Sequence, residues 1–214
     1  MGNDGSSIVR VKNLQVSLDH LPNKTRDKEA KNFDAVSRWT VCRLTGQPLR
    51  LPVVSDYLGN LLNKESILEW LLTPDKEDYS EEQIRLFGHI RSLKDVVELG
   101  NLVVDKDSRL KCDVGDEILG KSSSKLSYPA ICGHVFPRRM LDNATEQPKC
   151  PVCDKPISKS DTITLNAEST DRDALEKRMI RLKRSNLTHS GKRSKSKKRE
   201  APAIGNSNTK RQRN

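Results

Sequence analysis

Four potential metal ligands in the second half of the chain constrain its fold more than any other feature. Residues 131–136 read ICGHVF and residues 150–153 read CPVC, an arrangement of the form Cys-x-His followed by Cys-x-x-Cys. The ligands are Cys132, His134, Cys150 and Cys153. Zinc prefers thiolate sulfur and imidazole nitrogen, and four such donors complete its tetrahedral shell. We therefore predict one structural Zn²⁺, because no coordination position is left for water or substrate.

The spacing of the ligands fits this prediction. Cys150 and Cys153 can hold one side of an ion through a tight turn that Pro151 helps to fix. Cys132 and His134 lie two apart, so on a strand they project from the same face. The 15 residues between His134 and Cys150 leave room for a short helix. Two alternatives remain open, namely buried free thiols and a Cys150–Cys153 disulfide of the redox type.

The composition indicates a folded body followed by a basic tail. Hydrophobic residues make up 34% and aromatic residues 4% of the 214 residues, so part of the chain is not expected to join a core. Residues 171–214 hold 15 Lys/Arg and 4 Asp/Glu, a net +11, whereas the preceding residues carry a net −1. A basic tail indicates binding to nucleic acid, to an acidic partner or to a nuclear import receptor. We expect residues 188–214 to be a disordered tail.

A basic run in this tail is typical of a nuclear localisation signal, so we predict a location in the nucleus. The alternative is a solvated tail that no receptor reads. No aromatic residue interrupts the run, so base stacking is not expected there and contact with nucleic acid would be nonspecific. The residues of the run are Lys192, Arg193, Lys195, Lys197, Lys198 and Arg199.

The cysteine count and the hydropathy indicate an intracellular protein with reduced thiols. The five cysteines are an odd number, no hydrophobic signal segment opens the sequence, and no run approaches the length of a membrane span. In that setting clustered cysteine and histidine indicate metal ligands before disulfides. The opening MGNDGS matches the N-myristoylation pattern at Gly2. No basic cluster follows as a second anchoring signal, so the alternative is a Gly-rich arm.

The order of apolar runs and turn residues predicts an α+β fold of two small units, each a short β-hairpin followed by a helix. We expect a polar arm at 1–37, a metal-free unit at 38–72, a linker at 73–108, a zinc-bound unit at 109–168, a helix at 169–187 and the tail at 188–214. Within the linker, HIRSLKDVVEL predicts a helix that turns into a strand.

Caps and apolar stripes predict two of the helices. Asn63 is the expected N-cap of the helix in the first unit, and Thr170 is the expected N-cap of the C-terminal helix. The apolar stripes are Ile67, Leu68, Leu71 and Leu72 in the first helix and Leu175, Met179 and Leu182 in the second.

The two units resemble each other in sequence. CRLTGQPL parallels CDVGDEIL, which places Cys42 and Cys112 at equivalent points, where we expect small buried side chains. Further along, Gly59 falls on Gly133, Asn60 on His134, Leu62 on Phe136 and Ile67 near Met140. The match needs gaps, so coincidence is the alternative. In this comparison only the second unit carries metal ligands.

The Cys-x-His and Cys-Pro-x-Cys pair resembles the second metal site of a RING finger, the cross-braced fold of ubiquitin ligases. A RING finger binds another zinc through a Cys-x-x-Cys ahead of the hairpin and a Cys pair after the Cys-x-His. Here Cys112 matches the first of these ligands, but Gly115 stands in the place of its partner and residues 135–138 hold no ligand. This loss resembles the SP-RING of SUMO ligases, and residues 42–72 resemble the metal-free U-box. We expect apolar side chains to fill the place of the missing zinc, namely Val114, Leu119, Phe136 and Met140.

The combination of these pieces is similar to the replication termination factor 2 family. MGNDG, LNKESILEWLL, HIRSLKDVVEL, CGHVF and CPVC occur in that order over roughly residues 1–185, and the basic tail follows. The chain departs from the family pattern at Ser6, where glycine is usual, and near Leu62, where an aromatic residue is usual. The resemblance implies a nuclear protein that acts at stalled or paused replication forks, with links to SUMO and, in some members, to pre-mRNA splicing.

Three functions are compatible with this resemblance. The first is a scaffold without enzyme activity that binds replication-fork or spliceosomal proteins. The second is a RING-type ubiquitin or SUMO ligase, which would hold a charged conjugating enzyme in a reactive pose through Val114 and the turn at Pro151. Asp154 weighs against a ligase, because active ligases often carry arginine there. The third is a splicing factor whose effects at forks are indirect.

No catalytic residues are predicted, because the sequence offers no Ser-His-Asp arrangement, phosphate loop or paired carboxylate in a recognisable context. The other histidines are not expected to bind metal. His89 is expected to be a structural contact, whereas His20 falls in the polar arm and His189 in the tail.

Overall fold

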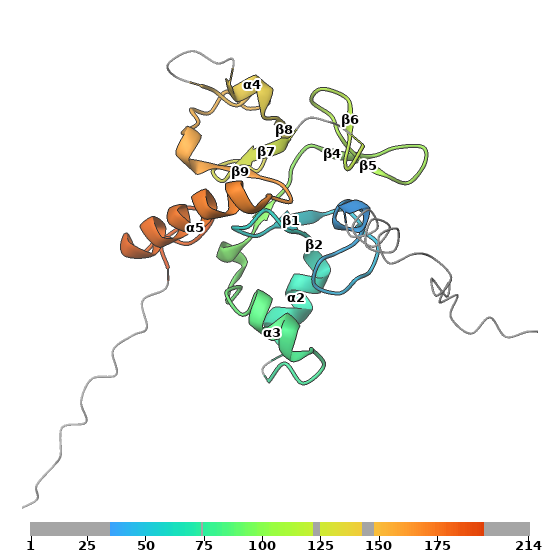
Figure 1. Ribbon diagram of the computed structural model, residues 1–214, viewed down its shortest axis with the longest axis vertical. Coiled ribbons are helices and arrows are strands. Elements are labelled where there is room, and N and C mark those ends of the chain that lie inside the picture. The colour runs from blue at the N-terminus through green and yellow to red at the C-terminus, as the bar shows by residue number, and fades with distance from the viewer. Residues whose placement is uncertain (1–34, 74, 122–124, 143–147, 195–214) are drawn as a thin grey trace, which may run out of the picture.

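A computed structural model describes residues 35–73, 75–121, 125–142 and 148–194, and it shows a mixed α/β fold with small antiparallel sheets (Figure 1). Residues 35–40 are helical. The strands are β1 (Val53–Ser55), β2 (Leu61–Asn63), β3 (Val97–Glu98), β4 (Leu102–Val104), β5 (Leu110–Cys112), β6 (Glu117–Ile118), β7 (Leu126–Pro129), β8 (Phe136–Pro137) and β9 (Thr162–Thr164). The helices are α2 (Lys64–Leu72), α3 (Glu81–Phe87), α4 (Arg139–Asp142) and α5 (Ser169–Arg184), with 3-10 turns η2 (Leu93–Asp95) and η3 (Lys159–Asp161). None of the described helices could cross a bilayer.

Two of the three sheets share one architecture, which confirms the internal repeat. The first sheet has the order β2-β1-β3 and another has the order β8-β7-β9, and every strand pair in both is antiparallel. In each unit a hairpin leads into a helix, α2 or α4, and the third strand joins the sheet later in the chain. The first unit therefore contains β1, β2, α2 and β3, and the second unit contains β7, β8, α4 and β9. The remaining sheet, β4-β5-β6, lies between the two units in the sequence. In Figure 1, α2 and α3 lie at one end of the molecule and α4 lies at the other.

One of the three hydrophobic clusters among the described residues draws on both units and on the middle sheet. Its buried side chains include Val53, Leu61, Leu102, Leu110, Leu126, Tyr128, Ile163 and Leu175. Burial of apolar surface is the main favourable term in folding. Because the two units share this buried surface, we expect them to fold together rather than as independent domains.

In each unit, a loop with a central glycine contacts the other unit just after its third strand. The carbonyl of Gly59 accepts a hydrogen bond of 2.9 Å from the amide of Asn166, just after β9, and the carbonyl of Gly133 accepts one of 3.1 Å from the amide of Gly100, just after β3. Both loop glycines have positive φ, and a side chain on either would clash with a backbone carbonyl of the opposite unit. This reciprocity gives the repeat an approximate two-fold relationship.

Helix α2 buries a narrower face than the sequence predicts. Ile67 and Trp70 are buried, and the indole nitrogen of Trp70 donates a hydrogen bond of 3.0 Å to the carbonyl of Ile90. The predicted stripe is therefore partly wrong, because Leu68 is 39% exposed and Leu72 is 80% exposed.

Residues 73–108 are not a linker, contrary to the prediction. Helix α3 has a capping box between Ser80 and Gln83, and the Gln83 amide also donates a hydrogen bond to the carbonyl of Leu44. Strand β3 completes the first sheet and β4 begins the next. The buried apolar residues of this segment are Phe87, Ile90, Val96, Val97, Leu99 and Leu102. The many charges obscure this apolar pattern in the sequence, although the expected change from helical turn to strand is confirmed by η2 and β3.

The C-terminal helix packs inward through its predicted stripe. Leu175 and Leu182 are buried, and Met179 is half-buried. Helix α5 begins directly after Glu168, which is its N-cap position. Thr170 as the N-cap is therefore wrong by two residues.

The chain remains folded beyond α5, so the prediction of a disordered tail is wrong for residues 188–194. The amide of Thr188 donates a hydrogen bond of 2.9 Å to the carbonyl of Lys192, which closes a turn. The amide of Ser190 donates to the carbonyl of Lys94, and the Lys94 ammonium group donates to the carbonyl of Arg193. These bonds hold the C-terminal loop against the turn that precedes β3.

His189 lies in this loop and is buried, with 1% of its surface exposed, which contradicts its expected place in a tail. The guanidinium of Arg178 lies 3.0 Å from His189 Nδ1. Arginine can only donate, so Nδ1 accepts and the imidazole proton resides on Nε2, which lies 3.0 Å from the Tyr128 hydroxyl. That hydroxyl donates to the carbonyl of Asp56 at 3.1 Å. Burial, followed by the charge of Arg178, lowers the pKa of His189 to about 3.

Candidate metal centre

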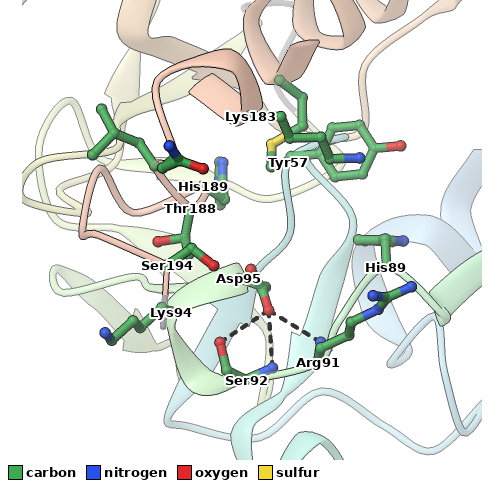
Figure 2. Close-up of a pocket in the computed structure, with 13 residues that line it drawn as sticks. Tyr57, His89, Arg91, Ser92, Lys94, Asp95, Lys183, Thr188, His189 and Ser194 are labelled. Atoms are coloured by element: carbon green, nitrogen blue, oxygen red, sulfur yellow. Dashed lines mark hydrogen bonds between the residues drawn. The ribbon is translucent and has the colours of Figure 1, made fainter. Parts of the chain in front are cut away.

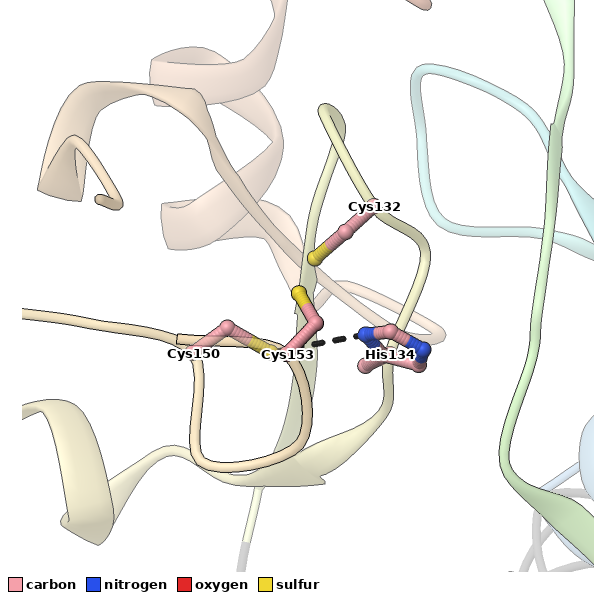
Figure 3. A group of neighbouring side chains, drawn as sticks. All are labelled: Cys132, His134, Cys150 and Cys153. Atoms are coloured by element: carbon pink, nitrogen blue, oxygen red, sulfur yellow. Dashed lines mark hydrogen bonds between the residues drawn. The ribbon is translucent and has the colours of Figure 1, made fainter. Parts of the chain in front are cut away.

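The structure brings Cys132, His134, Cys150 and Cys153 together beside β8 (Figure 3). One ligand atom from each residue lies within 4.8 Å of all the others, and Cys150 Sγ lies 3.5 Å from His134 Nδ1. In a tetrahedral zinc site with Zn–S bonds of about 2.3 Å, neighbouring sulfurs are roughly 3.8 Å apart. The cluster therefore has the dimensions of a site that could hold one metal ion.

Two backbone turns position the donors. In the first, the amides of Cys132 and Gly133 both donate to the carbonyl of Pro129 at the end of β7. In the second, the amide of Cys150 donates to the carbonyl of Lys155, and the amide of Asp154 returns to the carbonyl of Cys150. These bonds fix the two turns through the main chain and so bring the donor side chains towards one another.

The electrostatics of the cluster favour a bound cation. Burial is the main cause that raises the pKa of Cys132 to about 12, and the neighbouring sulfurs of Cys150 and Cys153 add to it. The backbone amide of Lys155 is the first cause that lowers the pKa of Cys153. Three crowded sulfurs cannot all ionise without a compensating charge, and a divalent ion would supply that charge. The donor set therefore fits Zn²⁺, and the role of the four residues as its ligands stays a prediction.

The first unit contains the same kind of turn without the ligands. In the segment VCRLTGQP, the amide of Cys42 donates to the carbonyl of Gln47, and the amide of Gly46 returns to the carbonyl of Cys42. This repeats the pattern of KCPVCDKP around Cys150. A bridge between Val41 and Pro48 matches one between residues 149 and 156. Cys42 is therefore buried as predicted, but in a turn that resembles the second cysteine pair.

Hydrogen bonds hold this metal-free turn against α2. The amide of Asn63 donates to the sulfur of Cys42 at 3.3 Å, and the Thr45 and Ser66 hydroxyls lie 3.4 Å apart. Asn63 occupies the N-cap position as predicted, but its side chain does not cap the helix. The side chain instead accepts from the amide of Arg50 and donates to the carbonyl of Pro48.

Asn60 takes the place of His134 in the first unit and points to an acid instead of a metal site. Its amide group donates to the carboxylate of Asp56 at 2.8 Å, and the imidazole of His89 lies 3.3 Å from the same oxygen. Burial alone would raise the pKa of Asp56, but the contacts with His89 and Asn60 hold it below its usual value. His89 is thus a structural contact, as predicted, and it belongs to no metal-ligand cluster among the described residues.

Asn101 lies beside Cys112 and Val135, where a RING finger would bind its other zinc ion, and the sequence did not indicate it. Its side chain accepts from the amide of Val135 at 2.6 Å and donates to the carbonyl of the same residue at 2.7 Å. The thiol of Cys112 donates towards the carbonyls of Val114 and Val135. Burial raises the pKa of Cys112, so the thiol stays protonated and can donate.

The apolar residues predicted to fill this place do so only in part. Leu119 and Phe136 are buried, and Val114 is half-buried and packs against the two clusters that contain them. Met140 is 40% exposed and fills this place only through its terminal methyl, which lies 3.9 Å from the position of a Cβ on Gly115. Hydrogen bonds from an amide and a thiol therefore stabilise part of the region that apolar side chains were predicted to fill.

The remaining predicted residues are dispersed. Val114 is half-buried and Pro151 is exposed on the turn between the two cysteines. Lys192 and Arg193 have exposed side chains in the C-terminal loop. The other residues of the proposed import signal and two further positions lie outside the described residues, namely Lys195, Lys197, Lys198, Arg199, Gly2 and His20.

Comparison with known proteins places these features in a family. The Rtf2 RING-finger family matches residues 1–214. The chain is 32% identical over 191 residues to Splicing factor rtf2 of Schizosaccharomyces pombe, an alignment that covers 89% of this chain and 75% of the relative. It is 30% identical over 175 residues to Replication termination factor 2 of Dictyostelium discoideum, with 67% and 62% covered. It is 32% identical over 199 residues to Replication termination factor 2 of Homo sapiens, with 84% and 61% covered.

Proposed function

The chain belongs to the Rtf2 RING-finger family, and from this premise we propose that it is a nuclear protein acting at paused or stalled replication forks as a zinc-stabilised scaffold for other proteins. The observation that carries the scaffold role is the closed donor set of the candidate metal centre. Two turns supply four protein donors within 4.8 Å of one another. A zinc ion held by all four has no open position for water or substrate, so it stabilises structure rather than catalysing a reaction.

Zn²⁺ would be held by Cys132, His134, Cys150 and Cys153, and it would supply charge compensation and a cross-link between two distant turns. Because such a site forms only in the folded chain, its binding free energy contributes to folding. The chain's own residues prepare the site through the backbone turns around Pro129 and Lys155. His134 also packs beside Gly100 of the other unit.

The joint core of the two units supports a scaffold. The Gly59 and Gly133 loops each contact the opposite unit, and Tyr128 connects Asp56 of the first unit to His189 of the C-terminal loop. Surfaces on the two units would therefore be presented at a fixed separation, which favours simultaneous engagement of two partners.

The names of the relatives support a role in nuclear nucleic-acid metabolism. Two of the relatives named above are called replication termination factors. The chain spans 62% and 61% of their lengths, and 75% of the S. pombe relative. The basic run that starts at Lys192 would act as the import signal and would add nonspecific affinity for nucleic acid.

Affinity purification from nuclei tests this proposal. The tagged full chain is recovered from cells with and without replication stress, and Cys150→Ala serves as the variant with a broken metal centre. We expect replisome proteins to be enriched with the wild type under stress and reduced with Cys150→Ala. Cys112→Ala, which removes a thiol outside the metal centre, is the matched control and is expected to retain them.

A splicing role is the second candidate, since the S. pombe relative is named a splicing factor. The same purification separates the two roles. Spliceosomal proteins recovered without replisome components would overturn the fork proposal in favour of splicing.

Ligase activity is the third candidate, and the exposure of the turn beside the metal centre favours it. Pro151 is exposed, and Val152 is an apolar side chain with 43% of its surface exposed. A conjugating enzyme charged with ubiquitin or SUMO could contact this turn. Discharge of the charged enzyme is measured with the wild type and with Cys150→Ala, and equal rates across a panel of conjugating enzymes would exclude a ligase.

A further inference from the structure

A pocket of about 630 Å³ opens where α5, the turn before β3 and the C-terminal loop meet (Figure 2). Ligand pockets in proteins commonly have volumes of about 300–1,000 Å³. Tyr57 and Lys183 line one side, and Arg91 and Lys94 line the other. Met179 also contributes to the lining. None of the candidate metal ligands lines this pocket, so it is separate from the metal centre.

The charges that line the pocket favour an anion. Three cationic side chains and one acidic side chain line it, a net positive charge, and one oxygen of the acid, Asp95, already accepts three hydrogen bonds. Its carboxylate accepts from the amide of Arg91 at 3.1 Å, and from the amide and hydroxyl of Ser92 at 2.9 and 3.0 Å. Among the described residues, neither Arg91 nor Lys183 has an ion-pair partner. Two positive charges are therefore available to a ligand.

Hydrogen bonds fix the walls of the pocket. Two hydrogen bonds hold the C-terminal loop to Lys94. The amide of Ser190 donates to the carbonyl of Lys94, and the ammonium group of Lys94 donates to the carbonyl of Arg193. His189, which also lines the pocket, is buried and held by Arg178. A wall set by such bonds loses little entropy when a ligand enters, which favours binding.

We propose that this pocket binds an acidic peptide segment of a partner protein. Its carboxylates would lie against Arg91 and Lys183, and a neighbouring apolar side chain would pack on Met179 and Leu187. This inference rests on the proposed scaffold role and adds the chemical class of one partner.

The lining favours a peptide over a single-stranded nucleic acid. Sites for single strands stack successive bases on several aromatic side chains. Tyr57 is the only Phe, Tyr or Trp residue in the lining, and its ring already packs edge-on against His89 with centroids 4.7 Å apart. The chain's own tail is also a poor occupant, because the run from Lys195 to Arg199 would bring positive charge to a positive pocket.

Selection from a library of random twelve-residue peptides tests the proposal with the full, zinc-loaded chain. We expect the selected peptides to be enriched in Asp and Glu next to an apolar residue. Enrichment is expected to disappear with Lys183→Glu and to persist with Arg184→Glu, which reverses a charge on the same helix outside the pocket. No acidic enrichment with the wild type would overturn the proposal.

Fluorescence anisotropy then measures the affinity of one selected peptide. Arg91→Glu and Lys183→Glu are each expected to weaken binding by about tenfold or more, because a charge-assisted contact becomes a repulsive one, whereas Arg184→Glu stays within about twofold. Equal losses for Lys183→Glu and Arg184→Glu would indicate general attraction to a basic protein and would overturn the proposal. Circular dichroism and zinc content verify that each variant is folded.

A labelled ten-nucleotide RNA forms the second arm of the experiment. If Lys183→Glu weakens RNA binding and leaves peptide binding unchanged, the pocket is a nucleic-acid site and the peptide proposal is wrong. The outcome is separable from the fork role. If the peptide selection fails but nuclear purification still recovers replisome proteins, the fork role is supported and the peptide proposal is wrong. If purification fails but the purified chain binds its peptide, the peptide proposal is supported and the fork role is wrong.

Discussion

The amide of Gly100 donates a hydrogen bond of 3.1 Å to the carbonyl of Gly133, so the loop that carries Cys132 and His134 rests on the end of β3 in the first unit. A Cβ atom added to Gly100 would lie 3.2 Å from the imidazole of His134. The first unit thus forms part of the support of the candidate metal centre, although it contributes none of the four donors.

The close approach at Gly133 predicts a large stability loss for Gly133→Ala. Gly133 has φ of +73°, and its added Cβ would clash with the carbonyl oxygen of Glu98. Gly191 has the same φ but open space around it. Gly191→Ala is therefore the matched control and is expected to cost about 1 kcal/mol for the backbone strain alone, whereas Gly133→Ala should cost more than about 3 kcal/mol.

Urea unfolding followed by circular dichroism measures both variants. Gly59→Ala should behave like Gly133→Ala, because its Cβ would clash with the carbonyl oxygen of Thr164 across the same interface. Equal losses for Gly133→Ala and Gly191→Ala would contradict the packing of the two units described here.

The hydrogen bonds of Asn101 predict that it replaces part of a lost zinc site. Asn101→Ala leaves the buried amide and carbonyl of Val135 without these partners, which should cost about 1–3 kcal/mol. The zinc content should not change, because Asn101 is not one of the four donors. Asn101→Asp keeps the acceptor, loses the donor and places a charge beside the carbonyl of Val135, so it should be less stable than the wild type. A stability unchanged in Asn101→Ala would show that apolar packing alone fills the site.

The convergence of the four Cys and His side chains could be predicted from the sequence, because the members of each pair are close in spacing. Cys132 and His134 lie on one loop and Cys150 and Cys153 lie on one turn, so each pair is readable without the fold. The repeat was readable for the same reason, since the equivalent glycines need positive φ wherever the hairpin occurs.

The long-range polar contacts could not be read from the sequence. Asn101 meets Val135 across 34 residues, and Tyr128 meets His189 across 61. Neither contact has a periodic or spacing signal, because hydrogen bonds of this kind depend on the assembled fold. A stretch of serine, lysine and arginine around a histidine is typical of a solvated tail. The burial of His189 depends on the position of α5, which the local sequence does not indicate.

Acid should destabilise the protein through His189. Its pKa is lowered from 6.5 to about 3 in the folded chain, so below pH 6.5 the unfolded chain binds a proton that the folded chain does not. Stability therefore falls as the pH drops from about 6.5 towards 3, with a slope approaching ~1.4 kcal/mol per pH unit. His189→Gln should start less stable and lack this part of the slope.

Chemical unfolding between pH 7.5 and 5 measures the two slopes. Protonation of the metal ligands also weakens zinc binding in acid, but this contribution is common to both proteins and cancels in the comparison. Identical slopes for the wild type and His189→Gln would contradict the buried neutral imidazole.

Removal of the metal should separate the role of Cys150 from that of Cys112. Elemental analysis of the purified wild type is expected to find one zinc ion per chain, and Cys150→Ala should lose it together with much of the stability, because the binding free energy contributes to folding. Cys112→Ala should keep its zinc and lose only about 1 kcal/mol, since its buried thiol makes hydrogen bonds and lies outside the candidate ligand cluster. A strong chelator should lower the melting temperature of the wild type and of Cys112→Ala by similar amounts and leave Cys150→Ala unchanged. Zinc lost equally from both variants, or two ions in the wild type, would place a ligand at Cys112 and contradict the single closed site.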